Sequence, residues 1–203
     1  TRSDRDWSSD VCSSDLTIAP RINAVGRLGD ANRAVELFTT TDPKRAMELA
    51  SVLEGENTAR RRIDEKTFGE ALKLVEDEHD LAADLGIVLH NNDWHPGVIG
   101  IVASRLVERY HRPSVMLTTI DGVAKGSARS IPGFNIYEAP QACEHLLLQF
   151  GGHEAAAGLA VEIDKIDIFK TEFNIALKKC MTQKDVIPEI SIDAKLVFSE
   201  ITP

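Results

Sequence analysis

The stretch "LGIVLHNNDWHPGVIGIVASRLVERYHRPSVMLTTI", Leu85 to Ile120, decides the fold. It begins with a short β-branched apolar run, which is typical of a strand buried on both faces. Pro96 suits the first turn of a helix, apolar residues follow at three- and four-residue steps, and Pro113 stops the helix. Residues 114–120 are then predicted as a second strand. Strand, helix and strand over this length predict a right-handed βαβ unit with two parallel strands.

The residues before this unit are predicted to be helical. Between residues 30 and 79, apolar side chains recur at three- and four-residue steps. Asp42 as N-cap and Pro43 at the first helical position divide the region into a short helix and a long one, which could connect two lobes. The charge run Arg60 to Lys66 mixes signs at helical spacing, which predicts a solvated, salt-bridged face.

After the unit, the chain is predicted to alternate strand, helix, strand, helix and strand, over residues 123–130, 135–150, 158–163, 167–181 and 187–198. Asn135 and Glu138 resemble a capping box that opens the first of these helices. Pro140 is a local conflict within it, placed early enough to bend the helix rather than break it. The last strand has the alternation of a new domain whose partner strands are missing. The fold class is therefore α/β.

Composition limits the possible functions. The chain has 203 residues, 43% of them hydrophobic, and a formal net charge of -9, as expected for a soluble globular protein with one domain and part of another. No apolar run is long enough for a membrane. An acidic protein needs a local Arg and Lys cluster to contact nucleic acid. Cys143 and Cys180 have neither metal-ligand nor disulfide spacing, which indicates buried thiols in a reducing cytoplasm.

The first sixteen residues, "TRSDRDWSSDVCSSDL", show neither helical nor strand periodicity and no signal-peptide core. Back-translation of Asp6 to Leu16 fits a common sequencing-library adapter. We therefore interpret residues 1–16 as a cloning or assembly scar and expect the true chain to be truncated at its N-terminus. Excluding the scar moves the formal net charge from -9 to -7, so the protein stays acidic.

Two motifs before and within the βαβ unit are candidate binding sites. "RINAVGRLGDA", Arg21 to Ala31, places two arginines around a glycine before a helix, and a surface turn is about as plausible as a site. In "WHPGVIG", Trp94 to Gly100, the first free amides of a helix lie beyond the carboxyl end of a parallel strand. That position favours an anion. Taken alone, however, an ordinary helix start with His95 as a surface imidazole is the better reading.

The strand "KGSARS" carries a third candidate site. Lys125, Ser127 and Arg129 alternate at period two and therefore point to the same face. A cation, a hydroxyl and a guanidinium on one face form a credible phosphate cradle, because arginine holds phosphate oxygens in a fork. A charged outer face of a strand is an equally plausible reading.

The fourth motif, "FGGHEAAAGL", Phe150 to Leu159, carries one histidine on a nearly bare backbone. Glycine and alanine would let a ligand approach Gly151, Gly152 and His153 closely. On its own the stretch favours another reading, with Gly151 capping the preceding helix and three alanines packing tightly. The four motifs together fall at ends or edges of neighbouring strands, where an open α/β sheet places its ligand site.

In this order and spacing, "APRINAVGRLGDA", "WHPGVIGIVASRLVERYHRP", "KGSARSIPGFNIYEA" and "FGGHEAAAGL" closely resemble the RecJ family of single-stranded-DNA-specific exonucleases, in the DHH phosphoesterase superfamily. The resemblance implies a DHHA1-type βαβ sheet lobe, preceded by a long connecting helix and followed by the start of an OB-fold. The expected segments are the scar, the end of a DHH lobe with its helical connector, DHHA1, a linking helix and a truncated OB-fold, at 1–16, 17–80, 81–163, 164–185 and 186–203.

The resemblance also implies a 5′ to 3′ exonuclease that acts on single-stranded DNA in repair and recombination, with a helicase or single-strand-binding protein as further candidate partners. Members of the family bind two Mn²⁺ or Mg²⁺ ions in a DHH lobe, but this sequence has no DHH motif. We therefore expect no metal ligands and no catalytic residues in this chain, and no hydrolysis by it alone. The residues expected to hold the strand are Arg27, Ser127, Arg129, Gly151, Gly152 and His153, with Lys125 from the cradle and His95 as a weaker candidate.

Two other functions fit the same motifs. One is a DHH and DHHA1 phosphodiesterase that cleaves short or cyclic oligonucleotides, and the other is a non-catalytic nucleic-acid-binding scaffold module. The helix and strand expected after Ala160 favour the processive nuclease, because the short-substrate enzymes normally end after DHHA1.

Overall fold

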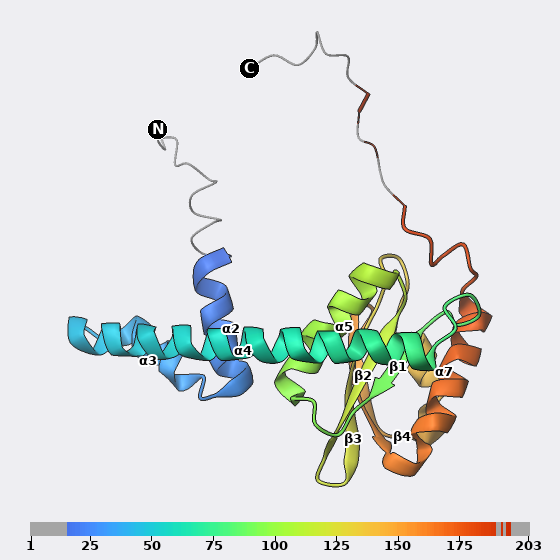
Figure 1. Ribbon diagram of the computed structural model, residues 1–203, viewed down its shortest axis with the longest axis horizontal. Helices are drawn as coiled ribbons and strands as arrows, with labels where there is room; N and C mark the ends of the chain where they lie inside the picture. Colours follow the sequence, from blue (N-terminus) through green and yellow to red (C-terminus); the bar gives the residue numbers. More distant parts are fainter. Residues whose placement is uncertain (1–15, 190–191, 193, 196–203) are drawn as a thin grey trace.

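The computed structural model describes residues 16–189, 192 and 194–195. A long helix crosses the molecule, with two short helices near one end and a five-stranded sheet at the other (Figure 1). The α-helices are α2 Ala19–Leu28, α3 Asn32–Thr39, α4 Pro43–Glu78, α5 Pro96–Tyr110, α6 Glu138–Ala142 and α7 Ile166–Cys180. The strands are β1 Ile87–His90, β2 Ser114–Ile120, β3 Val123–Arg129, β4 Leu147–His153 and β5 Ala156–Glu162, and 3₁₀ turns occupy η2 Glu144–Leu146 and η3 Ile163–Lys165.

The sheet has the order β1-β2-β3-β5-β4. β1 and β2 are parallel and are joined through α5, which confirms the predicted βαβ unit. The other pairs, β2 with β3, β3 with β5, and β4 with β5, are antiparallel. The order puts β4 at an edge of the sheet, beside β5 and two strands away from β3.

Helices cover the two faces of the sheet unequally. On one face, α5 buries Val98, Val102 and Leu106 against Ile87 and Met116, and the C-terminal half of α4 joins this core. On the other face, α7 contributes Phe169 and Phe173 to a larger core. That core also includes apolar residues of β2, β3 and β5, together with α6. The face under α7 is therefore covered as far as β5, whereas α5 packs on β2 and β3.

Helix α4 connects the two ends of the molecule. The side chain of Asp42 accepts a hydrogen bond from the amide of Lys44 at 3.0 Å, which confirms the predicted start of this helix. Its 36 residues span about 54 Å at 1.5 Å per residue. The predicted charge run is less solvated than expected, because Asp64 faces α5 and pairs with Arg105 at 3.0 Å.

The predicted helix from Asn135 to Phe150 is wrong. The predicted capping box is wrong as well: the side chain of Asn135 accepts from the amide of Tyr137 at 3.1 Å, but Tyr137 is itself the N-cap of a short helix, α6, which has no side-chain cap and ends at Ala142. Pro140 has no amide to donate, and the chain then turns into β4, whose pairing with β5 satisfies the backbone instead. The reading of Gly151 as a helix cap is wrong for the same reason. The turn weighed for "RINAVGRLGDA" is confined to residues 29–31, because α2 continues through both arginines to Leu28 and α3 begins at Asn32.

Several expectations concern residues at the two ends of the chain. The proposed scar, except Leu16, and half of the predicted strand 187–198 lie outside the described residues, and the described half is not in a strand. Within the described part, no helix is long and apolar enough to cross a membrane.

Cys143 is buried, and burial raises the pKa of its thiol to about 11. Cys180 was expected to be buried but is exposed at the end of α7.

Candidate nucleic-acid interface

The face of β5 and β4 on the α5 side of the sheet is open. On this side, Gln149, Gly151 and His153 of β4 are exposed, as is Gly158 of β5. The strand register shows which residues share the surface, since paired residues of antiparallel strands point to the same side. In three cross-strand rows, Lys125 pairs with Ala160 and then Gln149, Ser127 with Gly158 and Gly151, and Arg129 with Ala156 and His153.

We call these nine residues the small-residue face. Its central column, on β5, consists of alanine and glycine alone, and polar side chains border it on β3 and β4. Strands lie about 4.8 Å apart and rise about 3.3 Å per residue, so the face is about 10 Å wide and about 13 Å long. The face is open at Gly158 and Gly151, which are exposed, whereas Ala156 is half-buried and Ala160 is buried.

The glycines of this region have different surroundings. A Cβ atom added at Gly151 would meet no atom within 4 Å, and one at Gly158 would meet two carbonyl oxygens, each at 4.0 Å. Gly152 pairs with Ala157, which lies in the core under α7, so this glycine faces the opposite side. A Cβ at Gly152 would lie 2.5 Å from the Cα of Ala157 and collide with the carbonyl of Ala156. Gly152 thus lets the hairpin close, whereas Gly151 and Gly158 leave room above the sheet.

The first turns of α5 bring two arginines together beside this face. Arg27, in the last turn of α2, donates from Nη1 to the carbonyl oxygen of Gly97 at 3.2 Å. On the sheet side, a Cβ added at Gly100 would lie 2.7 Å from Nη2 of Arg129 and 3.0 Å from Oγ of Ser127. Gly97 and Gly100 therefore let α2 and the β3 side chains approach the same helix closely.

The loop before α5 fixes where this helix begins. The indole of Trp94 donates to the carboxylate of Glu70 of α4 at 2.9 Å. The backbone carbonyl of Trp94 accepts from the hydroxyl of Thr118 at 2.7 Å. His95 is the N-cap of α5, with its Nδ1 accepting from the amide of Gly97 at 3.0 Å. That bond makes Nδ1 the acceptor, so in the neutral ring Nε2 carries the proton.

Arg129 has the surroundings of an anion-binding residue. Its Nη1 donates to Oγ of Ser127 and to the carbonyl of Ala128, both at 2.7 Å. Burial lowers the pKa of the guanidinium, and the positive charge of Arg27 lowers it further. Among the described residues, neither Arg27 nor Arg129 forms a salt bridge with a carboxylate. Two neighbouring like charges without a counterion favour the binding of an anion.

The expected site residues fall into three groups. Arg27, Ser127 and Arg129 meet at α5, and His95 caps the same helix. Lys125, Gly151 and His153 lie on the small-residue face, which Ser127 and Arg129 border. The Nδ1 atom of His153 accepts from the amide of Ala155 at 3.3 Å within the hairpin turn. Gly152 stands apart, on the other side of the sheet.

The sequence reasoning missed Gln149 and two of the three residues of the β5 column of the small-residue face, Gly158 and Ala160. Gln149 was assigned to a helix, so its alternation with Gly151 and His153 in a strand went unused. Ala156, Gly158 and Ala160 also alternate, and that period of two in "EAAAGLA" was the available signal.

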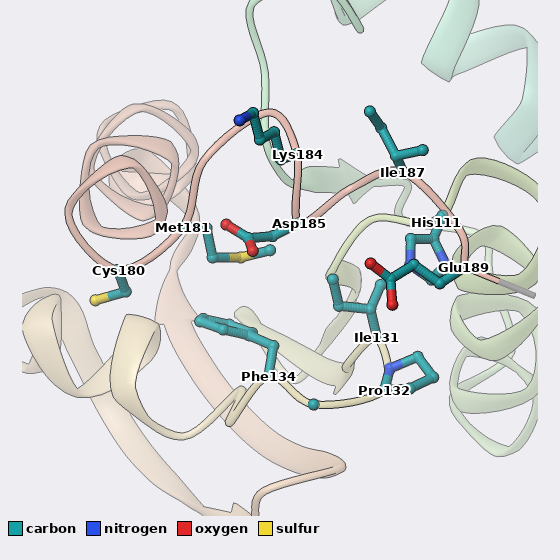
Figure 2. A pocket seen from close by; sticks show the side chains of 11 residues that line it. His111, Ile131, Pro132, Phe134, Cys180, Met181, Lys184, Asp185, Ile187 and Glu189 are labelled. Atoms are coloured by element: carbon teal, nitrogen blue, oxygen red, sulfur yellow. The ribbon is translucent and has the colours of Figure 1, made fainter. Parts of the chain in front are cut away.

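A separate cavity with a volume of about 470 Å³ lies between the β3–α6 loop and the end of α7 with the residues after it. Figure 2 shows the side chains that line it. Ile131, Pro132 and Phe134 line one side, and Cys180, Met181 and Lys184 line the other. No residue of the expected site lines this cavity.

Comparison with known proteins shows which family this chain resembles. Residues 82–179 match the DHHA1 domain family. The chain is 38% identical over 187 residues to the single-stranded-DNA-specific exonuclease RecJ of Bacillus subtilis, an alignment that covers 91% of this chain. The chain belongs to the RecJ family. It spans about a quarter of that curated relative, 24% of its length.

Solved structures of RecJ have the same fold as this chain. RecJ from Thermus thermophilus, in complex with Mn²⁺, superposes with a TM-score of 0.71 at 37% identity, covering 80% of this chain and 24% of that one. A manganese-bound exonuclease RecJ gives a TM-score of 0.75 at 33% identity, covering 89% of this chain and 44% of that one. The Thermus protein has also been solved with Mg²⁺, so these RecJ structures hold divalent metal ions.

The described part of this RecJ-family chain does not offer a site for such a metal. Within residues 16–189, 192 and 194–195, no group of three or more His, Cys, Asp or Glu side chains could hold an ion. Two Mg²⁺ or Mn²⁺ ions need several oxygen or imidazole ligands converging on one point. The side chains beside the small-residue face are instead hydrogen-bond donors, the guanidinium groups of Arg27 and Arg129 and the hydroxyl of Ser127, which are of the kind that binds an anion.

Proposed function

We propose that this chain is the strand-gripping part of a RecJ-type 5′ to 3′ exonuclease for single-stranded DNA. The observation that carries the proposal is the pair Arg27 and Arg129, which have no acidic partner among the described residues and lie beside an open face of glycine and alanine. A cationic cluster binds phosphate, and a bare sheet surface lets a polynucleotide lie close to the backbone.

In this proposal, each part of the site has a separate task. Arg129 holds two phosphate oxygens in its guanidinium fork, and Ser127, whose Oγ lies 2.7 Å away, donates its own proton to a third oxygen. Arg27 adds charge from the other side of α5. The strand continues across Gly158 and Gly151 toward His153. Holding the backbone at several points orients it, which is how a binding lobe assists hydrolysis carried out elsewhere.

Cleavage itself, a role in repair and recombination, a cytoplasmic location and contacts with a helicase or single-strand-binding protein belong to this proposal for the whole enzyme. The family relationship supports the cleavage of single-stranded DNA, because the curated relatives are exonucleases specific for it.

The test is binding of a 5′-phosphorylated single strand to the 203-residue chain and to its Arg129→Ala variant. We expect the substitution to weaken binding by roughly 1.5–3 kcal/mol, the range for a hydrogen bond to a charged group. One lost phosphate contact should also reduce the slope of log affinity against log salt by about 0.7. Fluorescence anisotropy over a range of salt concentrations measures both quantities.

Lys178→Ala is the control, because Lys178 is an exposed cation of α7, which covers the opposite face of the sheet. Its removal should leave the slope unchanged. If Arg129→Ala bound with the affinity and slope of the unsubstituted chain, Arg129 would not contact the strand.

A further inference from the structure

A second cavity opens where the small-residue face ends. It has a volume of about 530 Å³, within the range of ligand pockets, and lies between the C-terminal half of α5 and the loop that follows β3. Arg129 and Ala156 line it, and both also belong to the last row of the small-residue face. The cavity is therefore a continuation of the proposed strand path.

The lining is apolar with polar atoms at its rim. Val107 of α5, Pro132 and Ala155 form the walls, and the hydroxyls of Ser104 and Ser130 stand beside them. Ser104 donates its proton to the carbonyl of Gly100 at 3.2 Å. Ser130 donates to the carbonyl of Phe134 at 2.5 Å. Both hydroxyl oxygens keep lone pairs that can accept a hydrogen bond.

This chemistry suits a nucleobase better than a second phosphate. Glu108 also lines the cavity, and a carboxylate repels a phosphate but accepts a hydrogen bond from an exocyclic amino group. The apolar walls favour a ring that leaves water, and Arg129 beside them can hold the phosphate of the same nucleotide.

We propose that this cavity, which we call the α5 pocket, receives one base of the single strand, from the nucleotide whose phosphate Arg129 holds. The inference rests on the proposed function, since it assigns a subsite to the same strand. A base inserted here would fix the position of the strand along its own length, whereas phosphate contacts alone repeat with every nucleotide.

The test combines a filled pocket with a missing base. Short 5′-phosphorylated strands, each with one abasic nucleotide at a different position, are titrated against the 203-residue chain and its Ser104→Leu variant. We expect one abasic position to weaken binding to the unsubstituted chain about tenfold, since apolar burial of a ring is lost. Ser104→Leu should weaken binding of the intact strand by a similar factor, and the abasic penalty at that position should disappear.

Thr171→Leu is the matched control. Thr171 lies on α7, and its hydroxyl bonds to the carbonyl four residues earlier, Asp167, just as Ser104 bonds to Gly100. This variant should keep the abasic penalty. Ala155→Leu fills the α5 pocket from its opposite wall and serves as a second variant if Ser104→Leu fails to fold, as judged by thermal melting.

The outcomes separate the two proposals. Tight, Arg129-dependent binding with equal affinity for all the abasic strands would overturn the pocket and leave the proposed function standing. A full abasic penalty in both pocket-filling variants would do the same. Absence of binding to the intact strand by the unsubstituted chain would overturn the proposed function itself.

Discussion

A substitution at Gly100 can distinguish an effect on strand binding from an effect on stability. Gly100 lies within α5, where glycine costs about 1 kcal/mol relative to alanine, so its presence needs a reason. A Cβ there would lie 2.7 Å from Nη2 of Arg129 and 3.0 Å from Oγ of Ser127. Both atoms are at the ends of side chains that can move without disturbing the backbone. The lack of a methyl group at Gly100 therefore determines where the guanidinium of Arg129 lies and has little effect on the fold.

We accordingly predict that Gly100→Ala keeps or slightly raises the melting temperature while weakening single-strand binding about fivefold to tenfold. Alanine has a higher helix propensity than glycine, which stabilises α5. The displaced guanidinium of Arg129 loses part of its hydrogen bonding to the phosphate, which weakens binding. Thermal melting and anisotropy on the same preparation measure the two effects. Gly69→Ala, at a glycine of α4 with nothing within 4 Å of an added Cβ, should raise stability without changing binding. A Gly100→Ala variant that binds normally would contradict the role of this glycine.

In the hairpin of β4 and β5, two neighbouring glycines separate an effect on stability from an effect on binding. Gly152 has a φ of +158°, and its added Cβ would press on the backbone of β5, which cannot yield. Gly152→Ala should therefore destabilise the chain by about 1–3 kcal/mol, as expected of strain at a special backbone position. Gly151→Val should fold normally, since a β-branched residue suits a strand and the space above is empty, but should weaken strand binding by covering the small-residue face.

Urea unfolding and single-strand titration of both hairpin variants check this prediction. Gly122→Ala is a useful reference for backbone strain alone, because Gly122 has a φ of +78° in the β2–β3 turn and nothing lies within 4 Å of an added Cβ. If Gly151→Val lost stability and Gly152→Ala did not, the assignment of the two glycines to opposite sides of the sheet would be wrong.

The same hairpin shows what could be predicted from the sequence. The βαβ unit was predictable because each of its elements has a strong local signal, such as Pro96 at the helix start. The face of Lys125, Ser127 and Arg129 was predictable because the period of a strand is two. β4 was not, because "LLQFGGH" has weak strand propensity and forms a strand through its pairing with β5, a tertiary effect.

The site as a whole was predictable in its members but not in its geometry. Arg27 and Arg129 are separated by about a hundred residues, and they meet because Gly97 and Gly100 lie on one helix between them. No local sequence pattern indicates that these two arginines lie close together. Their proximity depends on α4, which packs against both α2 and α5 and so holds these two helices beside each other (Figure 1).

At the scale of the whole molecule, the site is a small cationic region on an acidic protein. The formal net charge is -9, and acidic residues lie close to the proposed strand path, including Glu108 at the α5 pocket and the exposed Glu154 in the hairpin turn. A single strand about as narrow as the small-residue face can avoid most of this charge. A duplex brings a second phosphate backbone, with one charge per about 1.7 Å of axis over both strands, toward the acidic remainder.

We therefore predict that the chain prefers a single strand to a duplex of equal length, and that the preference grows as the salt concentration falls. The screening length rises from about 8 Å at 0.15 M to about 30 Å at 0.01 M, so at low salt the second backbone experiences the negative charge of the whole protein. Local attraction by Arg27 and Arg129 also strengthens at low salt, but it acts on one backbone in either ligand. Competition titrations with both ligands at several salt concentrations measure the ratio of affinities. A ratio that stays constant or falls toward one at low salt would show that overall charge plays no part and that shape alone excludes the duplex.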